Sequence, residues 1–163
     1  TVDWMGERVD DISCSEYLYS YKGIKLSHAP YFDIDKEANM QKALSDLINQ
    51  GIIESAHDVS EGGLFIAMLE SAMCRNFGFE LYTSGEIRLD SFLFGEGQGR
   101  VVVTVKAGKE NDFIDMLNIS NVPCCAVGSV RADGVIMVDE EVFGKVSDFK
   151  TVYDNAIGDV LDK

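Results

Sequence analysis

The stretch from Ile52 to Arg75 restricts the fold more than any other, because a strand pattern, a polar loop and a helical pattern follow one another in it. Ile52–Ala56 predicts a short strand, and His57–Ser60 predicts the loop that leaves it. From Gly63 to Arg75 apolar residues lie almost all round a helix, so this helix should be buried on most sides. A strand that leads through a loop into a buried helix is typical of layered α/β and α+β proteins.

The remaining patterns add helices and strands on both sides of this stretch. Asp35 should cap a helix over residues 36–50 that ends at Gly51. The apolar spacing predicts that this helix buries one face, formed by Met40, Ala43, Leu44, Leu47 and Ile48. We also predict helices around 14–21 and over 109–118 and 148–161, strands over 79–83 and 100–105, an extended loop over 25–35, and a hairpin of 124–131 with 135–139.

Length, charge and cysteine content limit the classes of partner. A chain of 163 residues fits one domain, and its net charge of −14 would repel nucleic acids and anionic membrane surfaces. No stretch approaches the ~20 apolar residues of a membrane span, and no secretory signal opens the chain. The four cysteines lack C-x-x-C spacing, so we expect buried free thiols in the cytoplasm and neither a zinc site nor a disulfide framework.

The polar loop before the apolar helix is the first candidate site. In α/β folds ligands bind where strands end, and a helix N-terminus offers free N–H groups. Gly62 and Gly63 would let a ligand approach the backbone, with His57 and Ser60 as supporting polar groups. The alternative is that Asp58 or Ser60 caps the helix and the glycines only allow a sharp turn. Local chemistry does not decide between the two.

The acidic residues of this loop favour a metal-bridged ligand over a bare phosphate. Asp58 and Glu61 stand beside a helix end that contributes only ~0.3–1 kcal/mol to binding an exposed anion. Magnesium would overcome the repulsion, because it bridges phosphates to hard oxygen ligands. Asp58 is therefore the candidate magnesium ligand.

The glycine-rich segment 94–100 is the second candidate site. It is not a P-loop, because no Gly-Lys-Ser/Thr follows, and it leads into a strand, which excludes a dinucleotide fingerprint. Glu96, Gln98, Gly99 and Arg100 are positioned at a strand entry to line a cleft. The alternative is a bend or bulge before the strand. With two histidines and no G-x-S-x-G, no catalytic nucleophile is assigned.

Residues 57–72, HDVSEGGLFIAMLESA, closely resemble a motif of phosphoribosylformylglycinamidine synthases, the glutamine-dependent enzymes of purine synthesis. Residues 11–23 resemble the Gly-Ser-Glu-Tyr segment of that family, residues 30–58 its first helix and strand, and residues 92–105 its Ser-Glu-Ser-Gln-Gly-Arg strand entry. The chain departs from the family pattern at three positions. Cys14 stands where a glycine is usual, and Gly95 and Gly97 stand where serines are usual.

This resemblance implies a fold of the type found in the C-terminal domain of aminoimidazole ribonucleotide (AIR) synthase. That fold is α/β (α+β), a three-layer α/β/α sandwich with a mixed sheet and a partly ferredoxin-like topology. Residues 1–35 would be an arm or linker to an absent N-terminal ATP-binding domain, and residues 36–163 the C-terminal domain. We therefore expect residues 1–35 to pack poorly, and self-association into a homodimer is left open.

The resemblance also implies an activity for the intact enzyme. Family members convert formylglycinamide ribonucleotide to the amidine with ATP, Mg²⁺ and glutamine, so the partners would be the ATP-binding domain, a glutaminase and a phosphorylated ribonucleotide. The residues implied in substrate or nucleotide binding are His57, Asp58, Ser60, Gly62, Gly63, Glu96, Gln98, Gly99 and Arg100, with Asp58 toward magnesium. The chain alone should be catalytically inert.

Two other functions stay open. One is a domain of another superfamily member, such as an aminoimidazole ribonucleotide synthetase, although residues 11–23 and 92–105 argue against it. The other is a non-catalytic module whose acidic surface docks a protein partner. Ligand binding that depends on the neighbouring domains would distinguish an enzyme domain from such a module.

Overall fold

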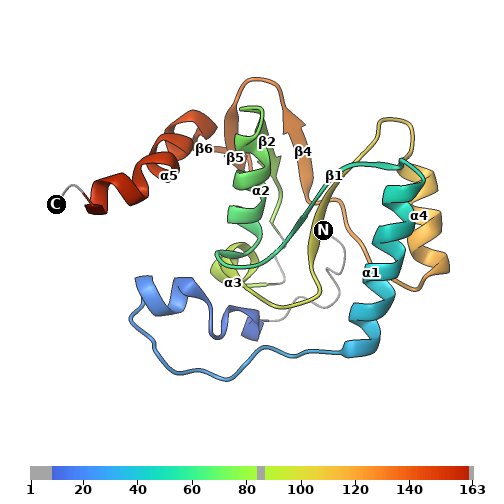
Figure 1. Ribbon diagram of the computed structural model, residues 1–163, viewed down its shortest axis with the longest axis horizontal. Coiled ribbons are helices and arrows are strands. Elements are labelled where there is room, and N and C mark those ends of the chain that lie inside the picture. Colours follow the sequence, from blue (N-terminus) through green and yellow to red (C-terminus); the bar gives the residue numbers. More distant parts are fainter. Residues whose placement is uncertain (1–8, 84–86, 162–163) are drawn as a thin grey trace. The chain divides into compact units, whose positions relative to one another are not determined.

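The computed structural model describes residues 9–83 and 87–161, which fall into two compact units (Figure 1). The first unit comprises Thr1–Ala67 and Ser84–Ala126, and the second comprises Met68–Thr83 and Val127–Lys163. The predicted α/β class with a mixed sheet is confirmed, because parallel and antiparallel strand pairs occur in one sheet of the second unit. The predicted division into an arm over 1–35 and a domain over 36–163 stays a prediction.

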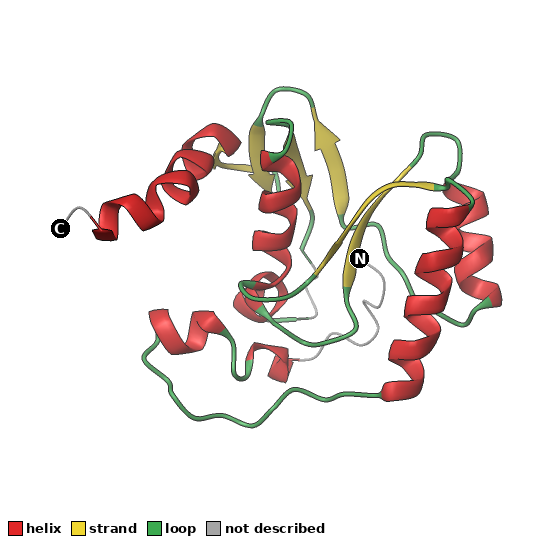
Figure 2. Cartoon of the chain, viewed as in Figure 1, coloured by secondary structure: helices red, strands yellow, loops and turns green. Residues whose placement is uncertain are grey.

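The first unit contains a two-stranded sheet and its helices (Figure 2). Its elements are a 3-10 helix (Val9–Ile12), a π-helix (Tyr17–Tyr21), α1 (Ile34–Asn49), β1 (Ile53–Asp58), α3 (Leu89–Phe94), β3 (Val101–Val105) and α4 (Glu110–Ile119). Helix α2 (Gly63–Met73) begins in this unit, directly after the polar loop. Every strand and long helix predicted in this part of the chain is therefore present, and the unassigned segment 87–94 supplies α3.

Helices α1 and α4 lie side by side and pack on strands β1 and β3 (Figure 1). Their buried core consists of Met40, Ala43, Leu47, Ile52, Val101, Phe113, Leu117 and Val122. The predicted face of α1 is confirmed for Met40, Ala43 and Leu47, with Leu44 partly buried. It is wrong for Ile48, which is 53% exposed, because Ile48 lies about 100° round the helix from Leu47.

Both ends of α1 are fixed by local hydrogen bonds. The predicted cap at Asp35 is wrong: Asp33 is the N-cap, and its carboxylate accepts from the Asp35 and Lys36 N–H groups at 3.1 and 3.2 Å. Asp33 has extended backbone angles, which let its side chain reach back over the first turn. The predicted C-terminal glycine is confirmed, since Gly51 has φ +64° and Ile52 N–H donates to Leu47 O at 3.1 Å.

The second unit contains β2 (Gly78–Leu81), β4 (Gly128–Arg131), β5 (Val135–Val138), β6 (Glu141–Lys145) and α5 (Val146–Leu161). The predicted hairpin of 124–131 with 135–139 is wrong, because β2 lies between β4 and β5 in the order β4-β2-β5-β6. Gly78 allows this insertion: a Cβ atom there would lie 2.1 Å from the Val135 carbonyl oxygen. The hairpin that forms joins β5 to β6 across Asp139 and Glu140, both of which have positive φ.

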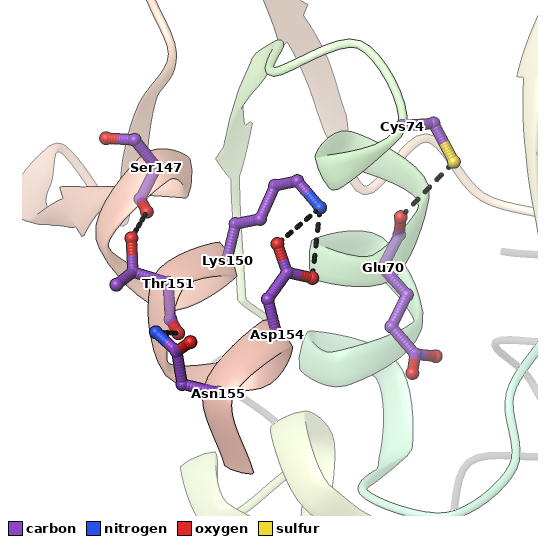
Figure 3. A network of polar contacts seen from close by, with 7 residues as sticks. All are labelled: Glu70, Cys74, Ser147, Lys150, Thr151, Asp154 and Asn155. Atoms are coloured by element: carbon purple, nitrogen blue, oxygen red, sulfur yellow. Dashed lines mark hydrogen bonds and ion pairs between the residues drawn. The ribbon is translucent and has the colours of Figure 1, made fainter. Parts of the chain in front are cut away.

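Helix α5 has several polar side-chain contacts within itself (Figure 3). Lys150 Nζ lies 3.0 Å from Asp154 Oδ2, and the side chains of Thr151 and Asn155 donate to carbonyl oxygens one turn earlier. Val146 is the buried residue of this helix. Figure 3 also shows the contact from Cys74 Sγ to the Glu70 carbonyl oxygen, which caps the end of α2 in the same local way.

Of the arm over 1–35, residues 1–8 lie outside the described residues, and the described remainder packs only in part. Asp11, Ile12, Ser13 and Ser15 are buried, so the expectation of poor packing is wrong for them. It is confirmed farther along the arm, where Leu26, in the loop that leads to α1, is 92% exposed. The expectation of buried thiols is also wrong, because Cys14 and Cys74 are exposed and the other two cysteines are half-buried.

Candidate functional site

The polar loop is positioned by the pairing of β1 with β3. The antiparallel register sets His57 opposite Val102 and Asp58 opposite Val101, and Val59 N–H continues the ladder by donating to Arg100 O at 2.9 Å. The Asp58 side chain is 79% exposed at the end of this ladder. The imidazole Nδ1 of His57 lies 2.7 Å from the Asp58 carbonyl oxygen, which fixes the ring beside the loop. The exposed carboxylate of Asp58 thus stands at a strand end that is paired with β3.

Gly62 and Gly63 form a turn that other residues could not make without strain. Their φ angles are +83° and +72°, in the left-handed region that favours glycine. The turn is closed by Gly63 N–H, which donates to Ser60 O at 3.0 Å. A Cβ atom at Gly63 would lie 2.7 Å from the Phe94 Cα atom, so the turn also packs directly on the backbone that precedes the second candidate segment.

Glu96 joins three separate stretches of the sequence. Its Oε1 atom accepts from Gly62 N–H at 2.8 Å and from Glu16 N–H at 2.9 Å. Its own N–H donates to the Asp11 carbonyl oxygen at 2.8 Å. The structure therefore brings the polar loop, the glycine-rich segment and residues 11–16 together around one half-buried carboxylate. The predicted role of the Gly62 backbone toward phosphate stays a prediction; here its N–H is bound to Glu96.

The three departures from the family pattern have local structural correlates. A Cβ atom at Gly97 would lie 2.7 Å from the buried Asp11 carboxylate, and one at Gly95 would lie 2.4 Å from the Ser91 carbonyl oxygen. The two glycines therefore leave room for Asp11 and for the end of α3. Cys14 has φ +61°, the conformation that favours the glycine usual there.

Arg100 and Gln98 differ in their surroundings. Arg100 is 4% exposed, and its Nη1 donates to the Gly95 carbonyl oxygen at 3.3 Å across the glycine-rich turn. Gln98 is exposed, and Gly99 between them has φ +77°. The guanidinium of Arg100 therefore fastens the segment, while the Gln98 amide is available to a ligand.

An open cavity of about 630 Å³ lies beside residues 98–100 in the first unit. Its polar lining includes the amides Asn39, Gln98, Asn118 and Asn121 and the cations Lys36 and Arg100, and Tyr31 and Phe32 supply aromatic rings. The cavity thus includes Gln98, Gly99 and Arg100 of the predicted set. His57, Asp58, Ser60, Gly62 and Gly63 are not among its lining residues, so the structure divides the predicted residues between a cavity and a loop.

Several residues of this region were not singled out in the sequence. Lys36 and Asn39 stand on the polar side of an amphipathic helix, where such side chains usually signal only solvent exposure. Asp11 and Glu16 gave one weak signal, because both fall in the stretch that resembles the family's Gly-Ser-Glu-Tyr segment. Their contacts with residues 95–97 join positions about 80 residues apart, as the separation of 80 between Glu16 and Glu96 illustrates.

The donor set near Asp58 fits a magnesium ion only if a ligand supplies most of the oxygens. Over residues 9–83 and 87–161, no group of three or more His, Cys, Asp or Glu side chains could hold a metal ion. Magnesium in nucleotide sites is commonly bound by one or two carboxylates together with phosphate oxygens and water. Asp58 meets that limited requirement, because its carboxylate is exposed on a fixed strand end.

Comparison with known proteins gives a consistent family. Residues 4–139 match the family model described as AIR synthase related protein, C-terminal domain. The phosphoribosylformylglycinamidine synthase subunit PurL of Caldanaerobacter subterraneus subsp. tengcongensis is 33% identical over 133 residues, which are 82% of this chain and 18% of that protein. The same subunit of Salinibacter ruber is 42% identical over 106 residues, 64% of this chain and 14% of that protein. The chain thus spans about a fifth or less of the length of these relatives.

Solved structures share the fold. PurL of Thermotoga maritima complexed with FGAR matches with a TM-score of 0.64 at 20% identity, over 77% of this chain and 23% of that one. Thiamine-monophosphate kinase from Stenotrophomonas maltophilia matches with a TM-score of 0.53 at 17% identity, over 80% of this chain and 47% of that one. No helix in the described part of the chain has the length and apolar character to cross a membrane.

Proposed function

Because this chain belongs to the family of AIR synthase related proteins, C-terminal domain, we propose that it is one domain of a phosphoribosylformylglycinamidine synthase. In the intact enzyme, ATP would phosphorylate the formamide oxygen of formylglycinamide ribonucleotide, and ammonia from glutamine would then displace the phosphate. The catalysis required is mainly positioning and charge neutralisation. A cytoplasmic location suits such a biosynthetic reaction.

The convergence of three motif stretches on Glu96 is the observation that supports this proposal most strongly. The stretches that resemble the family lie far apart in the sequence, yet the Glu96 carboxylate contacts both Gly62 and Glu16. A loop needed only to connect a strand to a helix would not require partners from two other motifs. We infer that the assembly presents a ligand-facing surface formed by the polar loop and the glycine-rich segment.

The residues of this surface would have different roles. Asp58 would contact a nucleotide through magnesium, which supplies charge neutralisation when bound, and Ser60 and His57 would hold the loop's polar edge toward the ligand. Gln98 would donate or accept hydrogen bonds at the cavity, and the buried Arg100 would fix the segment that carries it. Gly62, Gly63 and Gly99 would let the backbone take the required turns.

The opposite wall of the site would come from an ATP-binding domain, with a glutaminase as the source of ammonia. The T. maritima PurL structures include a complex with ATP and an assembly named PurLQS, which supports a multi-component enzyme of this kind. The chain by itself has a net charge of −14, which would repel a phosphorylated substrate at long range. We therefore expect neither turnover nor tight nucleotide binding from this chain alone.

Calorimetric titration tests the proposal. The chain is titrated with Mg-ATP and with formylglycinamide ribonucleotide, first alone and then with the ATP-binding domain and glutaminase of the enzyme. We expect ligand binding and amidine formation only in the mixture. Asp58→Ala should lower both the binding affinity and the rate of amidine formation at least tenfold. Glu54→Ala, a control at an exposed position of β1, should leave both unchanged. Turnover by the chain alone would contradict the proposal, and ligand-independent binding of a protein would favour an interaction module.

A further inference from the structure

The Glu96 carboxylate links two stretches of the chain that lie far apart in the sequence. Two backbone N–H groups from different stretches, Gly62 and Glu16, point at its Oε1 atom at 2.8 and 2.9 Å. We propose that Glu96 is a positioning residue, an internal hydrogen-bond acceptor that fixes the glycine turn of the polar loop and residue 16 in one arrangement. The effect on ligand binding rests on the proposed function, whereas the effect on the loop itself does not.

The backbone around Glu96 is anchored, so its carboxylate can hold other segments in place. Gly95 N–H donates to Ser91 O at 3.0 Å, and Glu96 N–H donates to Asp11 O at 2.8 Å. The Arg100 guanidinium closes the same turn by its contact with Gly95 O. The Glu96 side chain therefore projects from a fixed point, and one of its oxygens can accept both N–H groups at once.

The turn at Gly62 depends on such a partner. Both glycines adopt left-handed angles, and a glycine-glycine turn has more conformations to lose on folding than any other dipeptide. One hydrogen bond within the loop, from Gly63 N–H to Ser60 O, closes the turn. The bond to Glu96 attaches the turn to a different stretch of the chain. The Gly62 N–H is thus used by Glu96, whereas Asp58 and Ser60 stay exposed.

Amide hydrogen exchange of the whole chain, read residue by residue by NMR, tests the proposal. The measured quantity is the exchange rate of Gly62 and Glu16 relative to Ile52, whose N–H donates to Leu47 O in the core of the same unit. Glu96→Ala should raise this ratio about tenfold or more, since the acceptor is lost. Glu96→Gln should keep it within about threefold, because one amide oxygen can accept two hydrogen bonds.

The control variant and the contradicting outcomes are judged by the same ratio of exchange rates, that of Gly62 and Glu16 to Ile52. Glu54→Ala removes an exposed glutamate from β1 and should leave the ratio unchanged. The proposal is overturned if Glu96→Ala changes the ratio no more than the control does, or if Glu96→Gln raises it as far as Glu96→Ala. If Glu96→Ala unfolds the chain, so that Ile52 also exchanges freely, the Gln variant decides: a preserved ratio supports the proposal and a raised one contradicts it.

The ligand arm separates this inference from the proposed function. In the mixture with the ATP-binding domain, Glu96→Ala should weaken binding of formylglycinamide ribonucleotide at least fivefold. Glu96→Gln should bind it about as tightly as the natural chain does. If neither the natural chain nor any variant binds ligand, the proposed function fails while the exchange result still stands. If ligand binds and Glu96→Ala binds it equally well, positioning by Glu96 has no part in ligand binding and that part of the inference fails.

Discussion

The backbone of Gly63 rests on the backbone of Phe94: a Cβ atom at Gly63 would lie 2.7 Å from the Phe94 Cα atom and 2.8 Å from the Leu93 carbonyl oxygen. Gly63→Ala should therefore lower the free energy of unfolding by about 3 kcal/mol, near the upper end of ordinary substitutions. Strain at φ +72° contributes, and displacement of the α3 end contributes the rest. Urea unfolding followed by circular dichroism measures the change.

Gly23→Ala is the matched control for that substitution. Gly23 has φ +68°, close to the angle at Gly63, but apart from its two chain neighbours no described residue comes within 4 Å of its added Cβ. Its loss of stability should therefore be limited to left-handed strain, about 1–2 kcal/mol. Equal losses in the two variants would contradict the inferred backbone contact at Phe94.

The C-terminal ends of α1 and α4 predict stability changes in opposite directions for two substitutions. Helices α1 and α4 both end in the same arrangement, with Ile52 N–H on Leu47 O and Val122 N–H on Leu117 O. The residue with left-handed backbone angles is Gly51 after α1 and Asn121 after α4, with φ +64° and +52°. Asn121→Gly should raise the free energy of unfolding by up to about 1 kcal/mol, and Gly51→Ala should lower it by about 1 kcal/mol. Thermal unfolding of the two variants against the natural chain measures both, and a loss of stability in Asn121→Gly would contradict the first.

Local signals predicted most parts of the fold that depend on neighbouring residues, although they misplaced the N-cap of α1 at Asp35 and counted the exposed Ile48 in its core face. The core face of α1, its terminal glycine at residue 51 and the strand-loop-helix order around residues 52–75 all follow from spacing within one element. The placement of β2 between β4 and β5 could not follow, because the Asp133-Gly134 signal describes only the turn itself. Nothing in residues 124–139 reveals that a strand from residues 78–81 enters between them.

The candidate site shows the same limit at a larger distance. The polar loop and the glycine-rich segment were both identified, yet their connection through Glu96 joins residues 34 positions apart, from Gly62 to Glu96. The family resemblance grouped these stretches without saying which atoms meet. Residues such as Asn118 and Lys36 enter the cavity only because α1 and α4 pack side by side, which no single pattern contains.

Cys14 offers a direct test of backbone strain at a position where the family has glycine. Its φ is +61°, and its N–H donates to Ser27 Oγ at 2.7 Å while its thiol lies 3.4 Å from two carbonyl oxygens. Cys14→Gly and Cys14→Ala both remove the sulfur, so their difference isolates the strain. The glycine variant should be about 1 kcal/mol more stable than the alanine variant in urea unfolding. An alanine variant of equal or greater stability would contradict the strained backbone.

The N-cap of α1 predicts a loss of stability in acid that one substitution should reduce. The Lys36 N–H that donates to the Asp33 carboxylate holds the pKa of Asp33 below its usual value, and the Tyr31 hydroxyl adds to the effect. Because the pKa is lower in the folded state, this stabilisation is complete above the ordinary carboxyl pKa of about 3.9 and is lost as the pH falls through the folded value. Asp33→Asn keeps a capping oxygen without a titrating group. The natural chain should therefore lose stability relative to this variant as the pH falls below about 4, in thermal unfolding at a fixed salt concentration.

Asp46→Asn, which removes an exposed carboxylate from the same helix without a capping role, controls for the change in charge. A stability difference between natural chain and Asp33→Asn that does not vary with pH would show that the Asp33 charge adds nothing to the cap.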